Sequence, residues 1–320
     1  MREGQRKGME MKNNLMVKGV WAAMMTPYDE KGMASEDGVK EFMEFFLDKK
    51  QDGIFPVSNV GEFATLTFEE KRRIIEICVS MGKGKMKVCP GVTDLNLDRA
   101  LELAEFSCEQ GADGVIISSP YYYPYGNTYV EEYLRIFLKE SPLPVIIYHS
   151  PRFSNPVSET FLLEILKHPN VAAVKESSGD ARFLISLLER IKREEIDVEV
   201  MLGWEELLLT GLVHGASGCI TSCGGIVPEI LRKVYDSWTK GDMESAAFYQ
   251  QSISRITRVL GEDGLPYGYK MGMAARIPQR MLQSRHMNEL ENQLQLKAEK
   301  IKGMLDQELS LLESKQPCRN

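Results

Sequence analysis

Short, nearly continuous apolar runs alternate with longer amphipathic stretches along most of the chain. The apolar runs predict strands at 20–25, 53–58, 86–92, 114–119, 144–149, 171–175, 198–203 and 218–222. The amphipathic stretches predict helices over 37–50, 67–81, 97–110, 127–140, 157–167, 180–193, 204–213 and 228–239. Apolar residues recur in these helices at a spacing of three and four. Strands that are apolar on both faces are typical of a parallel sheet covered by helices.

Eight successive strand-then-helix units predict an α/β protein, a (β/α)8 TIM barrel with additional C-terminal helices. The alternative is an open, doubly wound sheet. That fold favours a glycine-rich GxGxxG turn after the first strand. The corresponding turn here reads TPYDEKG (26–32), which offers no phosphate cradle. The pattern therefore favours the barrel.

The chain divides into a leader over 1–18, the barrel over 19–240 and a C-terminal helical extension over 241–320. The leader is polar and lacks the apolar segment of a secretory signal, so we expect it to be disordered. An apolar stripe in the extension predicts one long helix: Met287, Leu290, Leu294, Ala298, Ile301, Leu305, Leu309 and Leu312. We expect this helix to pack on the barrel or at a subunit interface, and a coiled coil is the alternative.

Composition narrows the function classes. The 46 acidic residues outnumber the 39 basic ones and leave a net charge of −7, which argues against a nucleic-acid or anionic-membrane surface. No apolar run approaches the roughly 18 residues of a membrane span. The six cysteines and four histidines are scattered, without CxxC or HExxH spacing. We therefore expect a cytoplasmic protein with no metal site and no disulfide framework.

Lys175 is the most informative polar residue at the end of a predicted strand. Reactive groups of a barrel gather where strands end and loops begin, and four apolar residues precede Lys175 in the sixth strand. Burial penalises the charged form of an amine, and a neutral amine can attack a ketone to form a Schiff base. The alternative is a lysine that extends into solvent or pairs with Glu176.

Tyr148 ends the neighbouring fifth strand. Adjacent strands lie about 4.8 Å apart, so the two side chains can face each other. A phenol beside an amine supplies the proton transfers that imine chemistry needs. The alternative is a tyrosine with a buried ring and a solvated hydroxyl. The two residues alone leave both interpretations open.

Six ordered motifs carry a resemblance to a known family: GVWAAMMTP (19–27), VGEFATLTFEEK (60–71), SSPYYYP (118–124), VIIYHSP (145–151), VKESSGD (174–180) and GASGCITS (215–222). Over about residues 19–290 the chain resembles the dihydrodipicolinate synthase and N-acetylneuraminate lyase family, the pyruvate-dependent class I aldolases. The resemblance implies a lyase that condenses or cleaves pyruvate, or another 2-keto acid, with an aldehyde. It also implies a homotetramer and no cofactor beyond the imine on Lys175.

The resemblance implies a role for each matching residue. Lys175 corresponds to the Schiff-base lysine and Tyr148 to the proton-transferring tyrosine. Tyr122 corresponds to a tyrosine that a neighbouring subunit contributes. The segment that binds the substrate carboxylate corresponds to four consecutive residues, Asn59, Val60, Gly61 and Glu62.

This sequence departs from the family at three places. The carboxylate-binding loop usually carries two adjacent hydroxyl residues, where this chain has Asn59 and Val60. An amide is a poor proton carrier, so a full hydroxyl relay is in doubt. The arginine with which synthases recognise a second carboxylate falls at Phe153, while Arg152 lies one residue earlier. His149 replaces the asparagine that usually follows the tyrosine.

Two features favour the lyase side of the family. The motif GWEE, with Gly203, Glu205 and Glu206, is similar to a lyase pattern that binds polyhydroxylated tails, although paired acids also favour a helix N-terminus. Thr221 and Ser222 end the eighth strand, and Ser222 matches a serine of the lyase pocket.

Three activities stay open. One is aldol condensation or cleavage, with a sugar, amino-acid or aromatic aldehyde; Phe153 and Val60 would suit an apolar one. The second is a 2-keto-3-deoxy sugar acid dehydratase or a hydratase-aldolase of the same family. The third is a non-catalytic relative that binds a keto acid, which the Asn59–Val60 replacement alone favours.

Overall fold

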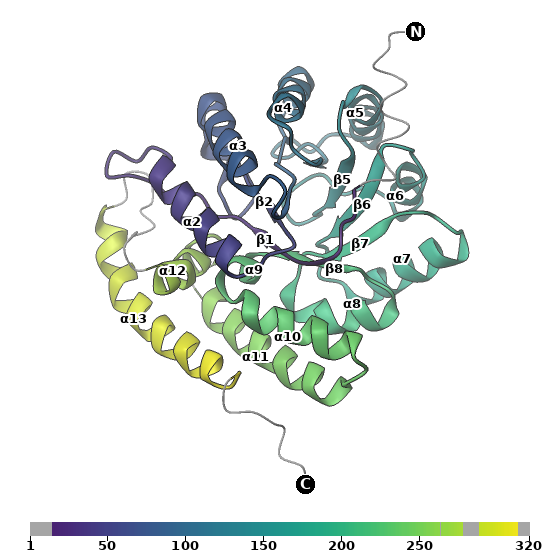
Figure 1. Cartoon of the computed structure of the whole chain (residues 1–320). Helices are drawn as coiled ribbons and strands as arrows, with labels where there is room; N and C mark the ends of the chain where they lie inside the picture. The colour runs from purple at the N-terminus through teal and green to yellow at the C-terminus, as the bar shows by residue number, and fades with distance from the viewer. Residues whose placement is uncertain (1–14, 263, 278–287, 313–320) are drawn as a thin grey trace.

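The structure, a computed structural model, describes residues 15–262, 264–277 and 288–312. Parallel strands form one curled sheet (Figure 1). They are β1 (Gly19–Ala23), β2 (Gly53–Phe55), β3 (Lys87–Val88), β4 (Val115–Ser118), β5 (Val145–His149), β6 (Val171–Glu176), β7 (Glu199–Leu202) and β8 (Gly218–Thr221). Their order is β3-β2-β1-β8-β7-β6-β5-β4. Each predicted strand is present.

Backbone hydrogen bonds join the two ends of this order. Gly91, just after β3, forms a parallel bridge with Ile116 of β4. The Ile116 N–H donates to the carbonyl of Pro90 at 2.8 Å, and the Val92 N–H donates to the carbonyl of Ile116 at 3.0 Å. The sheet therefore closes on itself, and the predicted (β/α)8 barrel is confirmed.

Several strands are shorter than the apolar runs that predicted them. The predicted runs continue through Pro56 and Pro90, beyond the last residues of β2 and β3. Proline has no N–H to give to a neighbouring strand, so the regular ladder ends there. The chain still leaves both strands toward the same end of the barrel.

Helices cover the outside of the barrel (Figure 1). Those that follow strands are α2 (Glu36–Asp48), α3 (Phe68–Gly82), α4 (Leu97–Gln110), α5 (Asn127–Glu140), α6 (Glu159–Leu166), α7 (Ala181–Arg193), α8 (Leu208–His214) and α10 (Pro228–Thr239). Short turns of helix lie in the loops: η2 (Phe63–Thr65), η3 (Glu205–Leu207) and α9 (Ser222–Ile226). The helix predicted over 204–213 is thus a 3₁₀ turn followed by α8.

Local sequence explains where these helices begin and end. Thr67 and Glu70 form a reciprocal capping box at the start of α3, and the Ser158 hydroxyl accepts from the Phe161 N–H at the start of α6. Gly111 ends α4 with a φ of +91°, a conformation that glycine adopts without strain. These signals fix the residues at which α3 and α6 begin and α4 ends.

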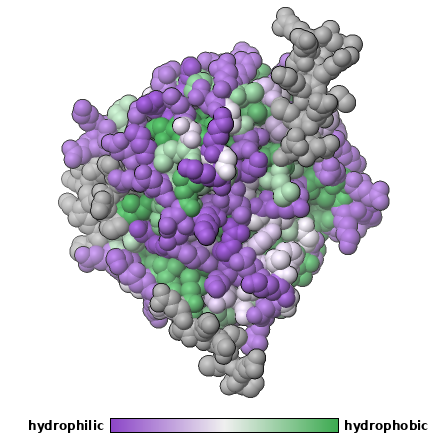
Figure 2. Space-filling view, in the orientation of Figure 1, coloured by the Kyte–Doolittle hydropathy of each residue, from purple (hydrophilic) through white to green (hydrophobic). Residues whose placement is uncertain are grey.

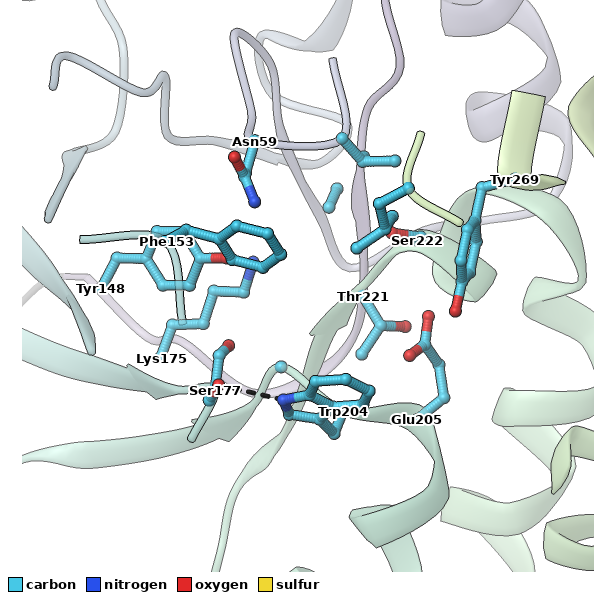
Figure 3. Close-up of a pocket in the computed structure, with 14 residues that line it drawn as sticks. Asn59, Tyr148, Phe153, Lys175, Ser177, Trp204, Glu205, Thr221, Ser222 and Tyr269 are labelled. Atoms are coloured by element: carbon cyan, nitrogen blue, oxygen red, sulfur yellow. Dashed lines mark hydrogen bonds between the residues drawn. The ribbon is translucent and has the colours of Figure 1, made fainter. Parts of the chain in front are cut away.

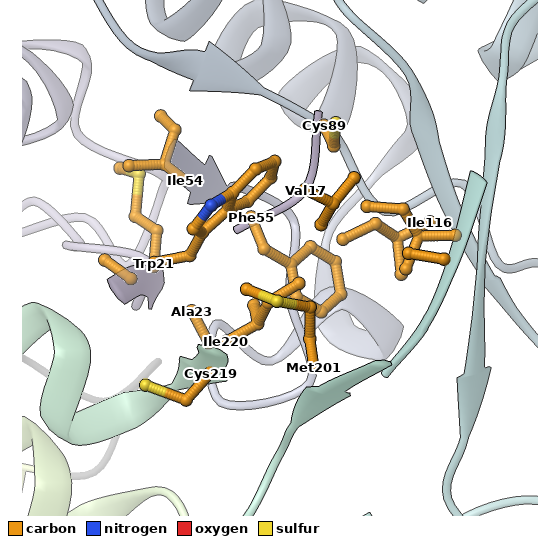
Figure 4. Packing of buried hydrophobic residues seen from close by; sticks show 14 of the residues in the cluster. Val17, Trp21, Ala23, Ile54, Phe55, Cys89, Ile116, Met201, Cys219 and Ile220 are labelled. Carbon is orange, nitrogen blue, oxygen red and sulfur yellow. The ribbon is translucent and has the colours of Figure 1, made fainter. Parts of the chain in front are cut away.

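Side chains fill the barrel interior away from the carboxyl ends of the strands. Figure 4 shows Trp21 of β1, Ile116 of β4 and Met201 of β7 among them, and all three are fully buried. Gly53 makes room for the indole, because a Cβ at this position would lie 2.5 Å from the Trp21 ring. The interior around these side chains is therefore packed, and a cavity opens nearer the carboxyl ends of the strands.

Three more helices follow the barrel: α11 (Met243–Gly261), α12 (Tyr267–Arg276) and α13 (Asn288–Ser310). α13 packs along α11 and α12 (Figure 1), where Ile301 and Leu305 are buried. Arg255 of α11 donates to Glu308 of α13 at 2.6 Å. The part of the apolar stripe from Ala298 onward thus meets helices of the same chain. Met287, Leu290 and Leu294 of that stripe lie outside the residues whose side chains the structure describes.

The described chain begins inside the predicted leader. Leu15 and Val17 are buried in the core, so packing starts before the expected boundary at residue 19; residues 1–14 lie outside the described part. The face in Figure 2 is largely hydrophilic, with apolar side chains in scattered patches. Within the described ranges, we find no helix with the length and apolar character of a membrane span.

Candidate active site

A cavity opens at the carboxyl ends of the strands. It measures about 520 Å³, its open mouth included. Its lining comes from strand ends, from the loop after β2 and from the C-terminal helices: Ala23, Asn59, Val60, Tyr148, Phe153, Lys175, Ser177, Gly203, Trp204, Glu205, Thr221, Ser222, Leu265 and Tyr269. Figure 3 shows Tyr148 and Lys175 on one side and Glu205, Thr221 and Tyr269 on the other.

Lys175 and Tyr148 lie side by side on one wall. They are register partners in β6 and β5, and the Lys175 Nζ lies 4.1 Å from the centroid of the Tyr148 ring. A second ring, that of Phe55, lies 4.9 Å from the same nitrogen. Lys175 is 4% exposed. The structure therefore brings together the two residues that the strand ends single out.

Glu176 is not the partner of Lys175. Successive side chains of a strand point to opposite faces, so Glu176 points outward, toward the helices. It is fully buried there, accepts from the Ser178 N–H at 2.7 Å and lies 3.6 Å from His149. The Lys175 amine therefore does not pair with Glu176, and Lys175 lines the cavity.

The loop after β2 contributes only part of the predicted carboxylate-binding segment. Asn59 and Val60 line the cavity. Gly61 lies behind it, because its carbonyl accepts from the Thr26 hydroxyl at 2.7 Å and a Cβ would lie 2.7 Å from the Met24 carbonyl. Glu62 also turns away and forms an ion pair with Lys270. Substrate contact by the side chain of Glu62 is therefore corrected to a contact inside the protein.

The acidic pair after β7 splits in the same way. Glu205 lines the cavity, is 3% exposed and accepts from the Cys223 N–H at 2.8 Å. Burial raises the pKa of the Glu205 carboxyl. Glu206 is not among the lining residues. Gly203 is required beside them, because a Cβ would lie 1.7 Å from the Ser177 hydroxyl.

Thr221 and Ser222 both line the cavity at the end of β8. The Thr221 hydroxyl accepts from the Gly224 N–H at 3.0 Å and so caps α9. This hydrogen bond fixes the Thr221 side chain. Ser222 follows as the first residue of α9.

Phe153 and Arg152 lie at the mouth. Phe153 lines the cavity and is 41% exposed. The Arg152 guanidinium is exposed and lies 5.6 Å from the Phe153 ring and 5.9 Å from the Trp204 ring. Arg152 therefore borders the entrance without lining the cavity.

Tyr122 does not reach the cavity of its own chain. Its ring is 83% exposed and meets the Tyr123 ring edge-on at 4.9 Å. Its φ of +66° is rare for a residue with a side chain, and it holds the ring away from the barrel.

Sequence reasoning missed five lining residues: Ala23, Ser177, Trp204, Leu265 and Tyr269. Trp204 carries a signal, because it stands inside the motif GWEE; its indole N–H donates to the Ser177 carbonyl at 2.9 Å. Leu265 and Tyr269 belong to the extension after residue 240 and carry no strand-end signal. Burial raises the pKa of the Tyr269 phenol.

This arrangement defines a class of protein. A (β/α)8 barrel with a buried lysine and a tyrosine at the carboxyl ends of neighbouring strands has its reactive groups where barrel enzymes keep their active sites. The Dihydrodipicolinate synthetase family matches residues 16–302. The chain belongs to this family, and the resemblance that its motifs carry is confirmed.

Relatives carry two kinds of name. The 4-hydroxy-tetrahydrodipicolinate synthase of Methanospirillum hungatei is 30% identical, covering 82% of this chain and 93% of its own. The N-acetylneuraminate lyase of Clostridium perfringens is 28% identical, with coverages of 78% and 86%. The dihydrodipicolinate synthase structure from Aquifex aeolicus has a TM-score of 0.80 at 25% identity, covering 89% and 98%. The protein is therefore a lyase-type enzyme of the pyruvate aldolase and lyase group.

Proposed function

We propose that the protein joins pyruvate to an aldehyde, or cleaves such an adduct, through an imine on Lys175. The observation that carries this proposal is the amine of Lys175, 4% exposed and 4.1 Å from the Tyr148 ring centroid at the cavity wall. Few groups other than an amine shielded from water can bind a ketone covalently at neutral pH. The names of the relatives support the same chemistry.

The proposed condensation begins with formation of the imine. The Lys175 nitrogen attacks the ketone carbon of pyruvate, and the ketone oxygen leaves as water once it has been protonated. The resulting imine accepts electrons when a methyl proton leaves, which gives an enamine. The enamine carbon then attacks the aldehyde carbon, and Tyr148 delivers a proton to the new alkoxide. Water finally hydrolyses the imine that this step restores, which releases the keto-acid product and the free Lys175 amine. Cleavage runs through the same steps in reverse.

The loop after β2 offers donors for the substrate carboxylate on the side of the amine. The Asn59 amide lies on the side of Lys175 and Tyr148 (Figure 3). Val60, the next residue of this loop, also lines the cavity and has a backbone N–H to donate. Neutral donors suit a carboxylate beside a cationic imine, because the imine itself supplies the opposite charge. The imine alone would serve as the electron sink, so we propose no further cofactor.

Assembly and location complete the proposal. Tyr122, 83% exposed and held outward by its backbone, has the placement of a residue that serves the site of a neighbouring copy. Tyr123 beside it is 53% exposed. We propose a homotetramer that works in the cytoplasm.

Dehydration of a 2-keto-3-deoxy sugar acid is the second candidate, and Glu205 favours it. The same imine would activate the carbon next to the former ketone. Loss of a proton there and of hydroxyl from the following carbon releases one water. A buried carboxyl with a raised pKa can donate the proton that this hydroxyl needs.

Borohydride reduction in the presence of pyruvate tests the imine. We expect a stable mass increase on the intact protein, absent without pyruvate and absent in Lys175→Ala. An unmodified wild-type protein would rule out imine chemistry. Incubation with an aldehyde panel and with sugar acids then separates the activities, because aldol cleavage releases pyruvate and dehydration releases none. An adduct without turnover on any of them would identify a keto-acid-binding relative.

A further inference from the structure

The turn after β2 contains a residue in an unfavourable backbone conformation. Glu62 has φ 58° and ψ 37°, the left-handed conformation that residues with a Cβ rarely adopt. Two and three residues earlier, Val60 and Asn59 line the cavity. The direction of their donor groups therefore depends on whatever holds Glu62 in this conformation.

A buried lysine on α12 pairs with Glu62 in this turn. Lys270 is 1% exposed, and its ammonium forms an ion pair with the Glu62 carboxylate. The same nitrogen lies 4.7 Å from the centroid of the Tyr28 ring. Tyr28 shares a hydrogen bond with Thr65 at 3.3 Å. Lys270 thus joins α12 to the loop after β1 and to the turn after β2.

Stability alone gives no reason for this lysine, because burying an ammonium costs free energy. Burial lowers the pKa of the Lys270 amine, and only the Glu62 carboxylate opposes this effect. Well-packed apolar side chains usually replace buried ion pairs without loss of stability. The preceding residue, Tyr269, lines the cavity. One turn of α12 therefore contributes both a residue that lines the cavity, Tyr269, and the ion pair of Lys270 with Glu62.

We propose that Lys270 is a positioning residue for the substrate carboxylate. Its ion pair with Glu62 fixes the turn that presents Asn59 and Val60, so it determines how tightly pyruvate binds before the imine forms. The inference rests on the proposed function. It assigns Glu62 to the support of the carboxylate site rather than to substrate contact.

The test measures trapping at Lys175 over a range of pyruvate concentrations in four variants of the full chain. These are Lys270→Met, Glu62→Gln, the double variant and, as a matched control, Arg255→Met. Arg255 also forms an ion pair within the C-terminal helices, with Glu308, but it does not line the cavity. Thermal unfolding is recorded for each variant.

We expect Lys270→Met to raise the half-saturating pyruvate concentration about tenfold or more, because it leaves the partly buried Glu62 carboxylate unpaired. The limiting trapping rate at saturating pyruvate should stay within about twofold, since the Lys175 and Tyr148 side chains are untouched. The double variant should recover part of the affinity, because no lone charge remains. Arg255→Met should lower the melting temperature without changing half-saturation.

Two results would overturn the inference. One is a Lys270→Met protein with wild-type half-saturation, and the other is an equal loss of affinity in the Arg255→Met control. If Lys270→Met does not fold, Glu62→Gln decides, and unchanged half-saturation in that variant rejects the proposal. A wild-type protein that traps no pyruvate removes the proposed function and this inference together, whereas normal wild-type trapping with unaffected variants removes the inference alone.

Discussion

The two walls of the cavity are built differently. Tyr148 and Lys175 stand on neighbouring strands, where backbone register sets their separation. Tyr269, on the opposite side (Figure 3), and Leu265 come from the helix and the segment that follow the barrel. Rigid strands suit groups that must meet within a fraction of an ångström. We therefore assign the chemistry to the strand wall and the choice of second substrate to the helix wall.

Removal of the Tyr148 hydroxyl should give the largest effect among variants that keep Lys175. Tyr148→Phe retains the ring over the Lys175 nitrogen and loses the proton carrier. We expect turnover to fall roughly 10²–10⁴-fold, with little change in melting temperature. Steady-state kinetics at saturating pyruvate measures the loss. Wild-type turnover would show that another group transfers the proton and that the strand wall does not hold the full chemistry.

A smaller effect is expected on the helix wall. Tyr269→Ala removes a buried ring on the side of the cavity away from Lys175 (Figure 3). We expect the KM for the second substrate to rise about tenfold, while half-saturation of pyruvate trapping stays near the wild-type value. Kinetics at varied aldehyde and fixed pyruvate provides the measurement. A change in half-saturation by pyruvate alone, with an unchanged KM for the second substrate, would show that the helix wall does not select the second substrate.

The smallest effect should appear in stability, through Glu205. In the unfolded chain this carboxyl titrates near 4.5, and burial raises its pKa in the folded protein. Between the two values the folded state binds more protons than the unfolded state, so stability falls as the pH rises through this window. Glu205→Gln keeps an acceptor for the Cys223 N–H and removes the titration.

Denaturant unfolding of wild type and Glu205→Gln, from pH 4 to 8, measures this difference. The variant should gain stability relative to wild type as the pH rises above about 4.5 and then hold a constant advantage. A difference that does not vary with pH would show that Glu205 titrates normally. The carboxyl would then have no spare proton for a leaving hydroxyl.

The strand wall could be predicted from sequence, because its signals are local. An apolar run followed at once by Lys175 or Tyr148 gives both the strand and the residue at its end. The predicted helices of the barrel agree with the observed ones to within two residues, since capping residues mark their ends, except that the helix predicted over 204–213 begins as a 3₁₀ turn and α8 starts only at Leu208. Trp204, directly after the glycine that follows β7, has the same kind of local signal.

The helix wall could not be predicted in this way. Which face of α12 meets the cavity depends on how α10, α11 and α12 pack, and their spacing along the chain does not contain that information. The contact between Glu62 and Lys270 joins residues more than 200 positions apart in sequence. Glu62 therefore looked like a ligand of the substrate, and only the fold shows its partner.

Mapping the borohydride adduct to one lysine tests the central claim most directly. Lys71, Lys175 and Lys270 are all buried, and burial lowers the pKa of both Lys71 and Lys270. Each of these two pairs with a carboxylate, Lys71 with Asp94 at 3.6 Å and Lys270 with Glu62, and neither lines the cavity. Peptide mass spectrometry after reduction with pyruvate should find the adduct on the peptide that contains Lys175. An adduct on Lys71 or Lys270, with Lys175 unmodified, would contradict the account.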